Sequence, residues 1–269
     1  MNLFLVVLYT DFGIQAFFGI LALLLNTELF FDFVGSLTFI GCSILCVLFD
    51  ESTEVSDSIK DIKAIQASLI CLWAGKLGSF LLYRILKAGE DKRFVEIKKS
   101  KGRFFRVWMI QGAWVYLNIV PSLFVFTAEK ENPRLALVSL AGWAIYAFGL
   151  VFETVADYQK TMFRSKPENK GKFITSGLWS LSRHPNYFGE ILLWYGLYIA
   201  ALPYFSSFLH YLTVLCPTLT ALQIIYLSGV PMLENSALKK WGTDPKYVEY
   251  LETTSCIIPC LGGKKQKTA

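Results

Sequence analysis

Long apolar runs recur along almost the whole chain, and they constrain its fold more than any other feature. A helix needs about 20 consecutive apolar residues to cross the hydrocarbon core of a membrane, and stretches of this kind occur throughout the 269 residues. The predicted spans are Leu3–Leu25, Leu29–Phe49, Ala67–Leu86, Val107–Thr127, Leu135–Phe152, Tyr187–Phe205 and Phe208–Val230. The sequence therefore predicts an all-α, polytopic membrane helix bundle with about seven transmembrane helices.

The composition excludes several other classes of protein. Apolar residues make up 54% of the chain and charged residues 17%, whereas soluble domains have roughly 45–50% and 25%. The net charge of +5 is carried by a few loops, and no basic stripe follows a polar helix face, so a soluble nucleic-acid binder is excluded. The first apolar run lacks the basic start of a cleaved signal and contains Asp11 and Gln15, so we expect it to remain as a helix.

The charges of the connecting segments predict an orientation in the membrane. Short loops rich in Lys and Arg stay in the cytoplasm, which places the basic stretches Arg84–Arg106 and Lys160–Arg183 on that side. The acidic loop Asp50–Lys63 and the short loop Glu129–Arg134 then lie on the opposite side. Seven crossings put the amino terminus outside or in the lumen and the carboxyl terminus in the cytoplasm.

The last residues of the chain resemble a membrane-retrieval signal. Lys265 and Lys267 occupy the fifth and third places from the end, as in the dilysine retrieval signals of the endoplasmic reticulum. In a eukaryotic source this predicts residence in that membrane, and a solvated Lys-rich tail is the alternative. We predict one integral membrane domain over 1–269, with variable helices in 1–65, a core over 66–262 and a basic tail at 263–269.

The cysteines do not predict a metal site. Four of the six lie in apolar runs, where free thiols behave as small hydrophobic groups. Cys256 and Cys260 would need histidines or further cysteines to bind zinc, and the chain has only His184 and His210.

Polar residues gather between Glu153 and Glu190, around the ends of two predicted helices. Glu153 and Asp157 are four residues apart and share a helix face, and Asn186 and Glu190 do so at the start of the next helix. Acids at membrane depth usually face a bundle interior or a wet cavity and mark a functional path. The alternative for Glu190 is that it only offsets the positive end of the helix dipole.

Three cations in the same region are of the type that binds phosphates. Arg164, Lys172 and Arg183 offer donors for charged oxygens, and Arg can bind them in a bidentate manner. Their alternative role is to provide the positive charge of a cytoplasmic loop. The imidazole of His184 could act as a catalytic acid or base. A histidine near a membrane surface, however, more often makes a structural hydrogen bond or is solvated.

The string Ser-Arg-His-Pro-Asn-Tyr-Phe-Gly-Glu at 182–190 follows Ala-Asp-Tyr-Gln-Lys at 156–160 and Gly-Leu-Trp at 177–179. This combination resembles the membrane steroid 5α-reductase superfamily, and more narrowly a branch of mostly uncharacterised members, from about Trp73 onward. The resemblance implies a seven-helix bundle that holds NADPH in a cavity open to the cytoplasm. The residues that it implies, with Arg183 added from the cation cluster, are Asp157, Tyr158, Arg164, Lys172, Arg183, Asn186 and Glu190.

The resemblance also implies a reaction. A hydride passes from the nicotinamide to the β-carbon of an α,β-unsaturated carbonyl in a hydrophobic small molecule, a steroid or another lipid enone, while an acid polarises the carbonyl. The expected partners are this substrate and membrane lipid. In the steroid enzymes a Tyr and a Glu of early helices polarise the carbonyl, but our match for the Tyr is Trp73, which has no phenol. Tyr83, Lys76 and Asp32 are the candidates for this catalytic role.

Two other functions compete with the reductase. Membrane methyltransferases of the isoprenylcysteine or phospholipid type, which use S-adenosylmethionine, also carry an Arg-His-Pro-x-Tyr string. They generally have a Glu-Glu pair where this chain has Glu234-Asn235, and Asp157 and Glu190 favour the reductase. The third hypothesis is a non-catalytic lipid-binding membrane protein, because a fold alone does not establish turnover.

Overall fold

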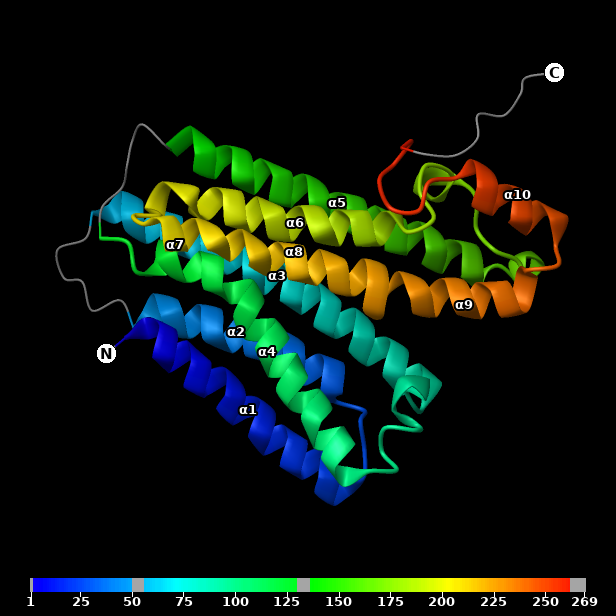
Figure 1. Ribbon diagram of the computed structural model, residues 1–269, viewed down its shortest axis with the longest axis horizontal. Helices are drawn as coiled ribbons and strands as arrows, with labels where there is room; N and C mark the ends of the chain where they lie inside the picture. Colours follow the sequence, from blue (N-terminus) through cyan, green and yellow to red (C-terminus); the bar gives the residue numbers. More distant parts are fainter. Residues whose placement is uncertain (1, 50–55, 130–135, 262–269) are drawn as a thin grey trace. The chain divides into compact units, whose positions relative to one another are not determined.

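The computed structural model describes residues 2–49, 56–129 and 136–261, and within these ranges it contains helices and no strand (Figure 1). This confirms the predicted all-α fold. The α-helices are α1 (Leu3–Leu25), α2 (Phe31–Leu48), α3 (Asp57–Ala88), α4 (Lys101–Phe126), α5 (Ala136–Ser165), α6 (Pro185–Ala201), α7 (Phe208–Tyr211), α8 (Leu215–Leu222), α9 (Val230–Trp241) and α10 (Pro245–Thr253).

Six helical segments of the described chain are long and apolar enough to cross a membrane. They are α1, α2, α3, α4, α5 and the segment Phe208–Trp241, which joins α7, α8 and α9. The remaining predicted span corresponds to α6, which has 17 residues and lies at the short limit for a crossing helix. The protein is therefore an integral membrane protein with a polytopic helix bundle. Lys265 and Lys267 of the predicted retrieval signal lie outside the described residues. So do residues 50–55 of the predicted acidic loop and residues 130–135 of the predicted short loop.

Two helices extend well beyond the apolar runs that predicted them. α3 begins at Asp57 instead of Ala67, so the predicted loop up to Lys63 is partly helical. α5 continues to Ser165 instead of ending at Phe152. Hydropathy marks only the part of a helix that suits lipid, whereas Lys, Gln, Glu and Ala are good helix formers and extend the helix into the polar region.

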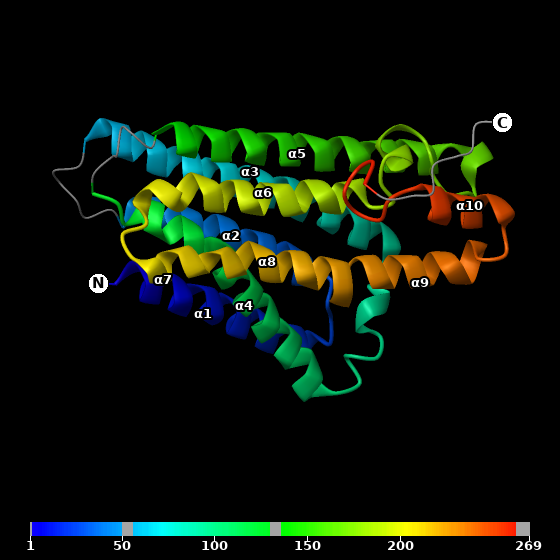
Figure 2. The same cartoon turned by 45° about the horizontal axis from the view of Figure 1, so that its top comes forward.

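Contacts group the chain into two compact units. The first consists of residues 1–137 and 201–216, in which α2 packs against α3 and α1 against α4 (Figure 2). Trp108 of α4 is fully buried in this unit, with the rings of Phe31 at 5.0 Å and Phe30 at 5.8 Å. Aromatic rings thus fill the space where α4 meets the start of α2.

Buried polar side chains also connect helices of the first unit. The Gln66 amide donates to the Ser122 hydroxyl at 2.8 Å, and the Gln15 amide donates to the Thr38 hydroxyl at 3.1 Å. Such hydrogen bonds hold membrane helices together, because lipid offers no other partner for these groups.

The second unit consists of residues 138–200 and 217–269, and glycines bring its α5 and α6 into backbone contact. A Cβ added at Gly149 would lie 2.6 Å from the carbonyl oxygen of Gly189, and one added at Gly196 would lie 2.6 Å from the Tyr146 nitrogen. Close helix approach through small residues is the usual packing of membrane helices. This contact fixes the start of α6 beside the polar end of α5.

Candidate functional site

Hydrogen bonds attach the polar segment before α6 to the C-terminal part of the second unit. The buried Ser182 hydroxyl lies 2.8 Å from the Ile257 carbonyl and accepts the His184 backbone N–H at 3.1 Å. The Arg183 backbone N–H donates to the Ser255 carbonyl at 2.8 Å. Segments about 75 residues apart in the sequence therefore form one support, from which the side chains of Arg183 and His184 extend.

A cavity of about 270 Å³ lies next to this support. Five of the residues around it are Lys or Arg and one is an acid. Its wall is formed by Lys160, Phe163, Arg164, Lys172, Phe173, Ile174, Trp179, Arg183, His184, Leu233, Glu234, Ser236, Ala237, Lys240, Trp241, Tyr247 and Tyr250. The cavity therefore combines an excess of positive charge with aromatic surface.

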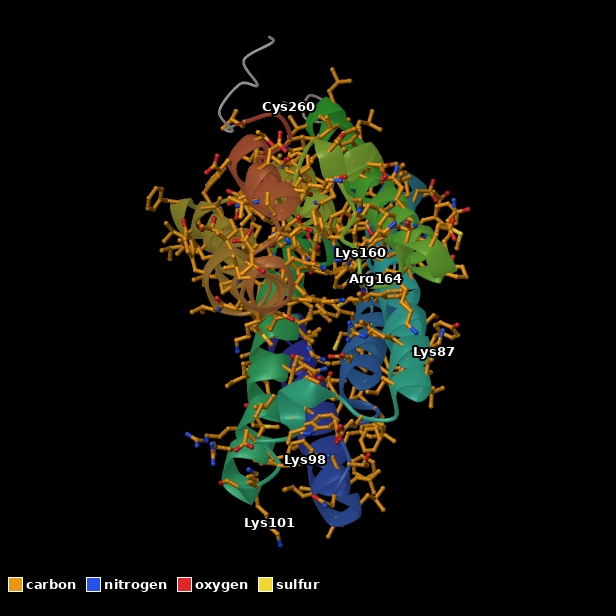
Figure 3. The ribbon with its side chains drawn as sticks, turned by 90° about the vertical axis from the view of Figure 1, so that its right-hand side faces the viewer. Lys87, Lys98, Lys101, Lys160, Arg164 and Cys260 are labelled. Carbon is orange, nitrogen blue, oxygen red and sulfur yellow. The ribbon has the colours of Figure 1, made fainter. Side chains whose placement is uncertain are left out.

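The cations of α5 lie on one face of that helix. Lys160 and Arg164 are one turn apart, and Figure 3 shows them next to each other. The Lys160 ammonium lies 4.3 Å from the centroid of the Trp179 ring, a cation–π contact. The Trp179 indole N–H in turn donates to the Ala156 carbonyl at 2.9 Å, which holds the ring in place.

Aromatic rings form another part of the wall. Phe173 packs edge-on against Trp241 at 5.7 Å and against Tyr247 at 5.0 Å. The Trp241 indole N–H donates to the Gly171 carbonyl at 2.6 Å, and the Tyr250 hydroxyl donates to the Trp179 carbonyl at the same distance. Burial raises the pKa of Tyr250, so its hydroxyl remains protonated and can serve as this donor. The rings are thus fixed by hydrogen bonds to the backbone.

The Glu234 carboxylate is the centre of the polar contacts in the wall. Its Oε1 lies 3.2 Å from an Arg183 nitrogen and 3.2 Å from His184 Nε2. Burial lowers the pKa of His184 below its usual value of 6.5, although the hydrogen bond and charge of Glu234 act in the opposite direction. A neutral His184 that donates from Nε2 has an unprotonated Nδ1, which is buried and has no hydrogen-bond partner.

One group of possible metal ligands occurs at the same place. His184, Glu234 and Cys256 offer ligand atoms within 4.8 Å of one another, although the sequence predicts no metal site. The Arg183 guanidinium already supplies a positive charge to Glu234. Burial raises the pKa of Cys256, which favours the thiol over the thiolate that a metal would need.

Comparison with known proteins places the chain in a family. Residues 17–254 match the family described as proteins of unknown function, DUF1295. The chain belongs to this family. A region of 70 residues is 44% identical to a probable O-methyltransferase, ustE, of Ustilaginoidea virens. The match covers 26% of this chain and 23% of that relative, so the chain spans about a quarter of the relative's length. No solved structure matches the chain.

In this DUF1295 protein, the predicted cofactor residues all belong to the second unit, and three of them line the cavity. These are Arg164, Lys172 and Arg183. Asn186 lies in the first turn of α6, and its Oδ1 is buried without a hydrogen-bond partner. A buried amide oxygen of this kind is able to accept a hydrogen bond from a bound molecule.

The other predicted cofactor residues are not part of the wall. Tyr158 is 63% exposed, and Asp157 and Glu190 are half-buried on α5 and α6. Their role in binding stays a prediction. The sequence reasoning did not include Lys160 and Lys240 in the cofactor set. Lys160 could have been identified as a candidate from its i, i+4 spacing to Arg164, which places both cations on one helix face.

The catalytic candidates belong to the first unit. Asp32 accepts ion pairs from Arg93 at 2.6 Å and Arg84 at 3.6 Å, and Tyr83 is 64% exposed. Lys76 is half-buried in the middle of α3. Trp73 is buried, and the Phe39 ring packs against it edge-on at 5.2 Å. Their catalytic role stays a prediction.

Proposed function

We propose that this protein is an NADPH-dependent reductase of a carbon–carbon double bond in a lipid-like substrate. The observation that carries the proposal is the cavity of the second unit, where five Lys or Arg residues and one acid stand among aromatic rings. The motif at 182–190 supports the same conclusion, because it lies directly beside this cavity.

The donor set fits the cofactor chemically. Arg164, Lys172 and Lys240 offer charge-assisted hydrogen bonds to phosphate oxygens, and NADPH carries both a pyrophosphate and a 2′-phosphate. Partly exposed rings such as Phe173 and Trp241 offer apolar surface for flat heterocycles. At about 270 Å³ the cavity is slightly smaller than typical ligand pockets, which start at roughly 300 Å³, so it fits one part of a dinucleotide.

The residues of the chain then bind and orient the cofactor. When bound, NADPH supplies the hydride. Arg164 and Lys172 hold phosphate groups by charge, and the Asn186 amide fixes an orientation through the oxygen that now has no partner. A cofactor bound among the aromatic rings displaces water from them, and this strengthens its electrostatic contacts with the cations.

Thermal unfolding of the detergent-purified full chain with different ligands tests this proposal. A ligand that binds only the native state stabilises it by RT ln(1 + [L]/Kd), or about 2.7 kcal/mol at a hundredfold excess over Kd. We expect NADPH to raise the unfolding temperature more than NADH does, and S-adenosylmethionine to leave it unchanged. The Arg164→Gln/Lys172→Gln variant should lose the response to NADPH. The control Lys166→Gln/Lys170→Gln, which removes two cations outside the wall, should keep it.

A methyltransferase is the second candidate, favoured by the match to the probable O-methyltransferase ustE. The His184–Glu234 pair would suit it, because a neutral imidazole held by a carboxylate can accept the proton of an acceptor hydroxyl. Stabilisation by S-adenosylmethionine and none by NADPH would replace the reductase with this function. If neither ligand stabilises the folded chain, the third hypothesis of a non-catalytic lipid-binding protein is favoured.

A further inference from the structure

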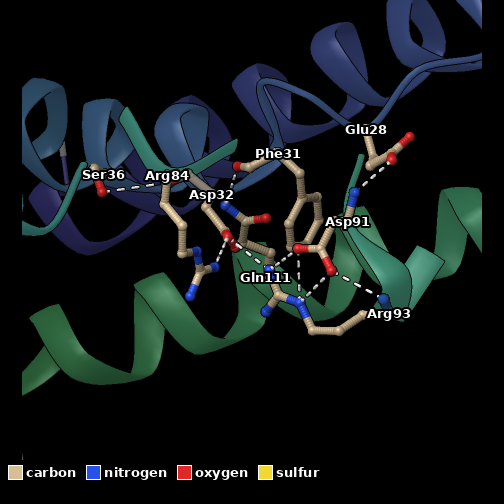
Figure 4. A network of polar contacts seen from close by, with 8 residues as sticks. All are labelled: Glu28, Phe31, Asp32, Ser36, Arg84, Asp91, Arg93 and Gln111. Carbon is tan, nitrogen blue, oxygen red and sulfur yellow. Dashed lines mark hydrogen bonds and ion pairs between the residues drawn. The ribbon is translucent and has the colours of Figure 1, made fainter. Parts of the chain in front are cut away.

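Acidic residues hold part of the basic segment between α3 and α4 in place. Figure 4 shows Asp32 of α2 between Arg84 and Arg93, and the Arg93 guanidinium also binds the Asp91 carboxylate. Burial alone would raise the pKa of Asp91, but the hydrogen bonds and charge of Arg93 hold it below its usual value, so the carboxylate stays ionised.

Glu28 is a second acid that holds this basic segment in place. The buried Glu28 carboxylate forms an ion pair with Lys98 at 2.6 Å and accepts the Asp91 backbone N–H at 3.0 Å. The acids of this region therefore neutralise Arg93 and Lys98.

The cations that remain at this end of the first unit are exposed. Lys87 lies in the last turn of α3, and Lys101, Arg103 and Arg106 lie in the first two turns of α4. None of the four has an acidic partner among the described residues. Figure 3 shows Lys98 and Lys101 at this end of the bundle and Lys87 on the α3 side. The first turn of α4 contains no acid, although the positive end of a helix dipole favours anions. Positive charge is therefore unbalanced here.

Apolar side chains lie exposed beside these cations. Leu24 and Leu25 end α1 with 78% and 60% exposure, and Leu86 and Ile110 are 69% and 62% exposed. These residues belong to α1, α3 and α4, which are long and apolar enough to cross the membrane. Exposed cations directly next to exposed apolar residues on such helices lie at the depth of lipid headgroups.

We propose that Lys101, Arg103 and Arg106 form a binding surface for the headgroups of anionic phospholipids. Negative phosphate groups supply the charge that the protein itself lacks at the start of α4, and the acyl chains cover the neighbouring leucines. This surface is distinct from the cavity of the proposed cofactor and does not depend on that function.

The test measures lipid retention by the purified full chain. The protein in a neutral detergent is titrated with phosphatidylglycerol or phosphatidylcholine, and bound lipids are counted by native mass spectrometry. We expect tighter binding of phosphatidylglycerol, weakening with salt, and a loss of about fivefold in affinity for each cation neutralised in Lys101→Gln/Arg103→Gln/Arg106→Gln. The control Lys166→Gln/Lys239→Gln/Lys246→Gln has the same net charge and should bind as the wild type.

Several results would overturn the proposal. One is equal affinity for phosphatidylglycerol and phosphatidylcholine. Another is the same loss of phosphatidylglycerol affinity in both triple Gln variants. The third is displacement of phosphatidylglycerol by inorganic phosphate at matched concentration, which would indicate a site for the free anion. The charge-conserving variant Lys101→Arg/Arg103→Lys/Arg106→Lys should keep the preference. If the triple Gln variant does not fold, the single variant Arg103→Gln gives the same comparison, because its side chain is exposed.

Discussion

His184 Nε2 lies 3.2 Å from Oε1 of Glu234, and the same oxygen lies 3.2 Å from the Arg183 guanidinium. One carboxylate thus orients both an imidazole and a guanidinium at the wall of the cavity. Burial is the main cause that lowers the pKa of His184 and so favours the neutral imidazole, against the opposing hydrogen bond and charge of Glu234. The permanent positive charge next to the carboxylate is therefore that of Arg183.

The lowered pKa of His184 predicts that the protein loses stability in mild acid. Between the folded-state pKa and the ordinary value of 6.5, the unfolded chain binds more protons than the folded chain, so the free energy of unfolding falls as pH decreases through this window. Unfolding temperatures measured from pH 8 to pH 5 should show the loss in the wild type and a smaller loss in His184→Gln. The variant His210→Gln, which leaves His184 in place, should retain it, and an unchanged profile in His184→Gln would contradict the assignment.

Asn186→Ala should weaken NADPH binding by about tenfold, because it removes the buried amide oxygen that accepts a hydrogen bond from the cofactor in our proposal. The matched control is Asn235→Ala, since Asn235 is exposed whereas the Asn186 amide oxygen is buried. Equilibrium binding of NADPH to the purified variants gives the comparison, and the same affinity in both would remove Asn186 from the site. Glu190→Gln, the other change on this helix, should also weaken binding if the predicted cofactor face is correct.

Gly149→Ala should destabilise the second unit by about 2–3 kcal/mol, because the new Cβ would meet the Gly189 carbonyl oxygen at 2.6 Å and force α5 and α6 apart. Gly13→Ala is a matched control, since a Cβ there meets nothing within 4 Å and alanine favours a helix over glycine by up to about 1 kcal/mol. The free energies of unfolding in denaturing detergent should therefore change in opposite directions. Equal effects would show that the close contact carries no energy.

Glu28→Gln should destabilise the first unit by about 2 kcal/mol. The variant replaces the buried carboxylate by a neutral amide, so the positive charge of Lys98 loses its compensating negative charge. Glu96→Gln provides the comparison: Glu96 and Lys99 are also 2.6 Å apart, but both are exposed, so the loss should stay below about 0.5 kcal/mol. Burial alone would raise the pKa of Glu28, but the hydrogen bonds and charge of Lys98 and the Asp91 N–H hold it below 4.5. The stability from this pair should therefore be present above pH 4.5 and be lost as the pH falls through the folded-state pKa.

The fold class followed from local patterns. Apolar runs of about 20 residues can satisfy their backbone only as helices in a membrane, which is why the all-α polytopic bundle could be predicted without the structure. The helix ends could not be predicted in the same way. Asp57 and Ser165 lie in polar sequence, where hydropathy carries no information and helix propensity together with packing decides the boundary.

The candidate site was predicted in part for a similar reason. The sequence alone determined which polar residues lie beside the ends of α5 and α6, and three of the predicted cations line the cavity. Only the tertiary structure brought Glu234 to His184, 50 residues away, and placed Lys160 in the wall with Tyr158 outside it. Position along a chain determines which face of a helix a residue occupies, but the packing of several helices decides which of those faces meet. Contacts between distant residues are therefore properties of the folded chain and of no single segment.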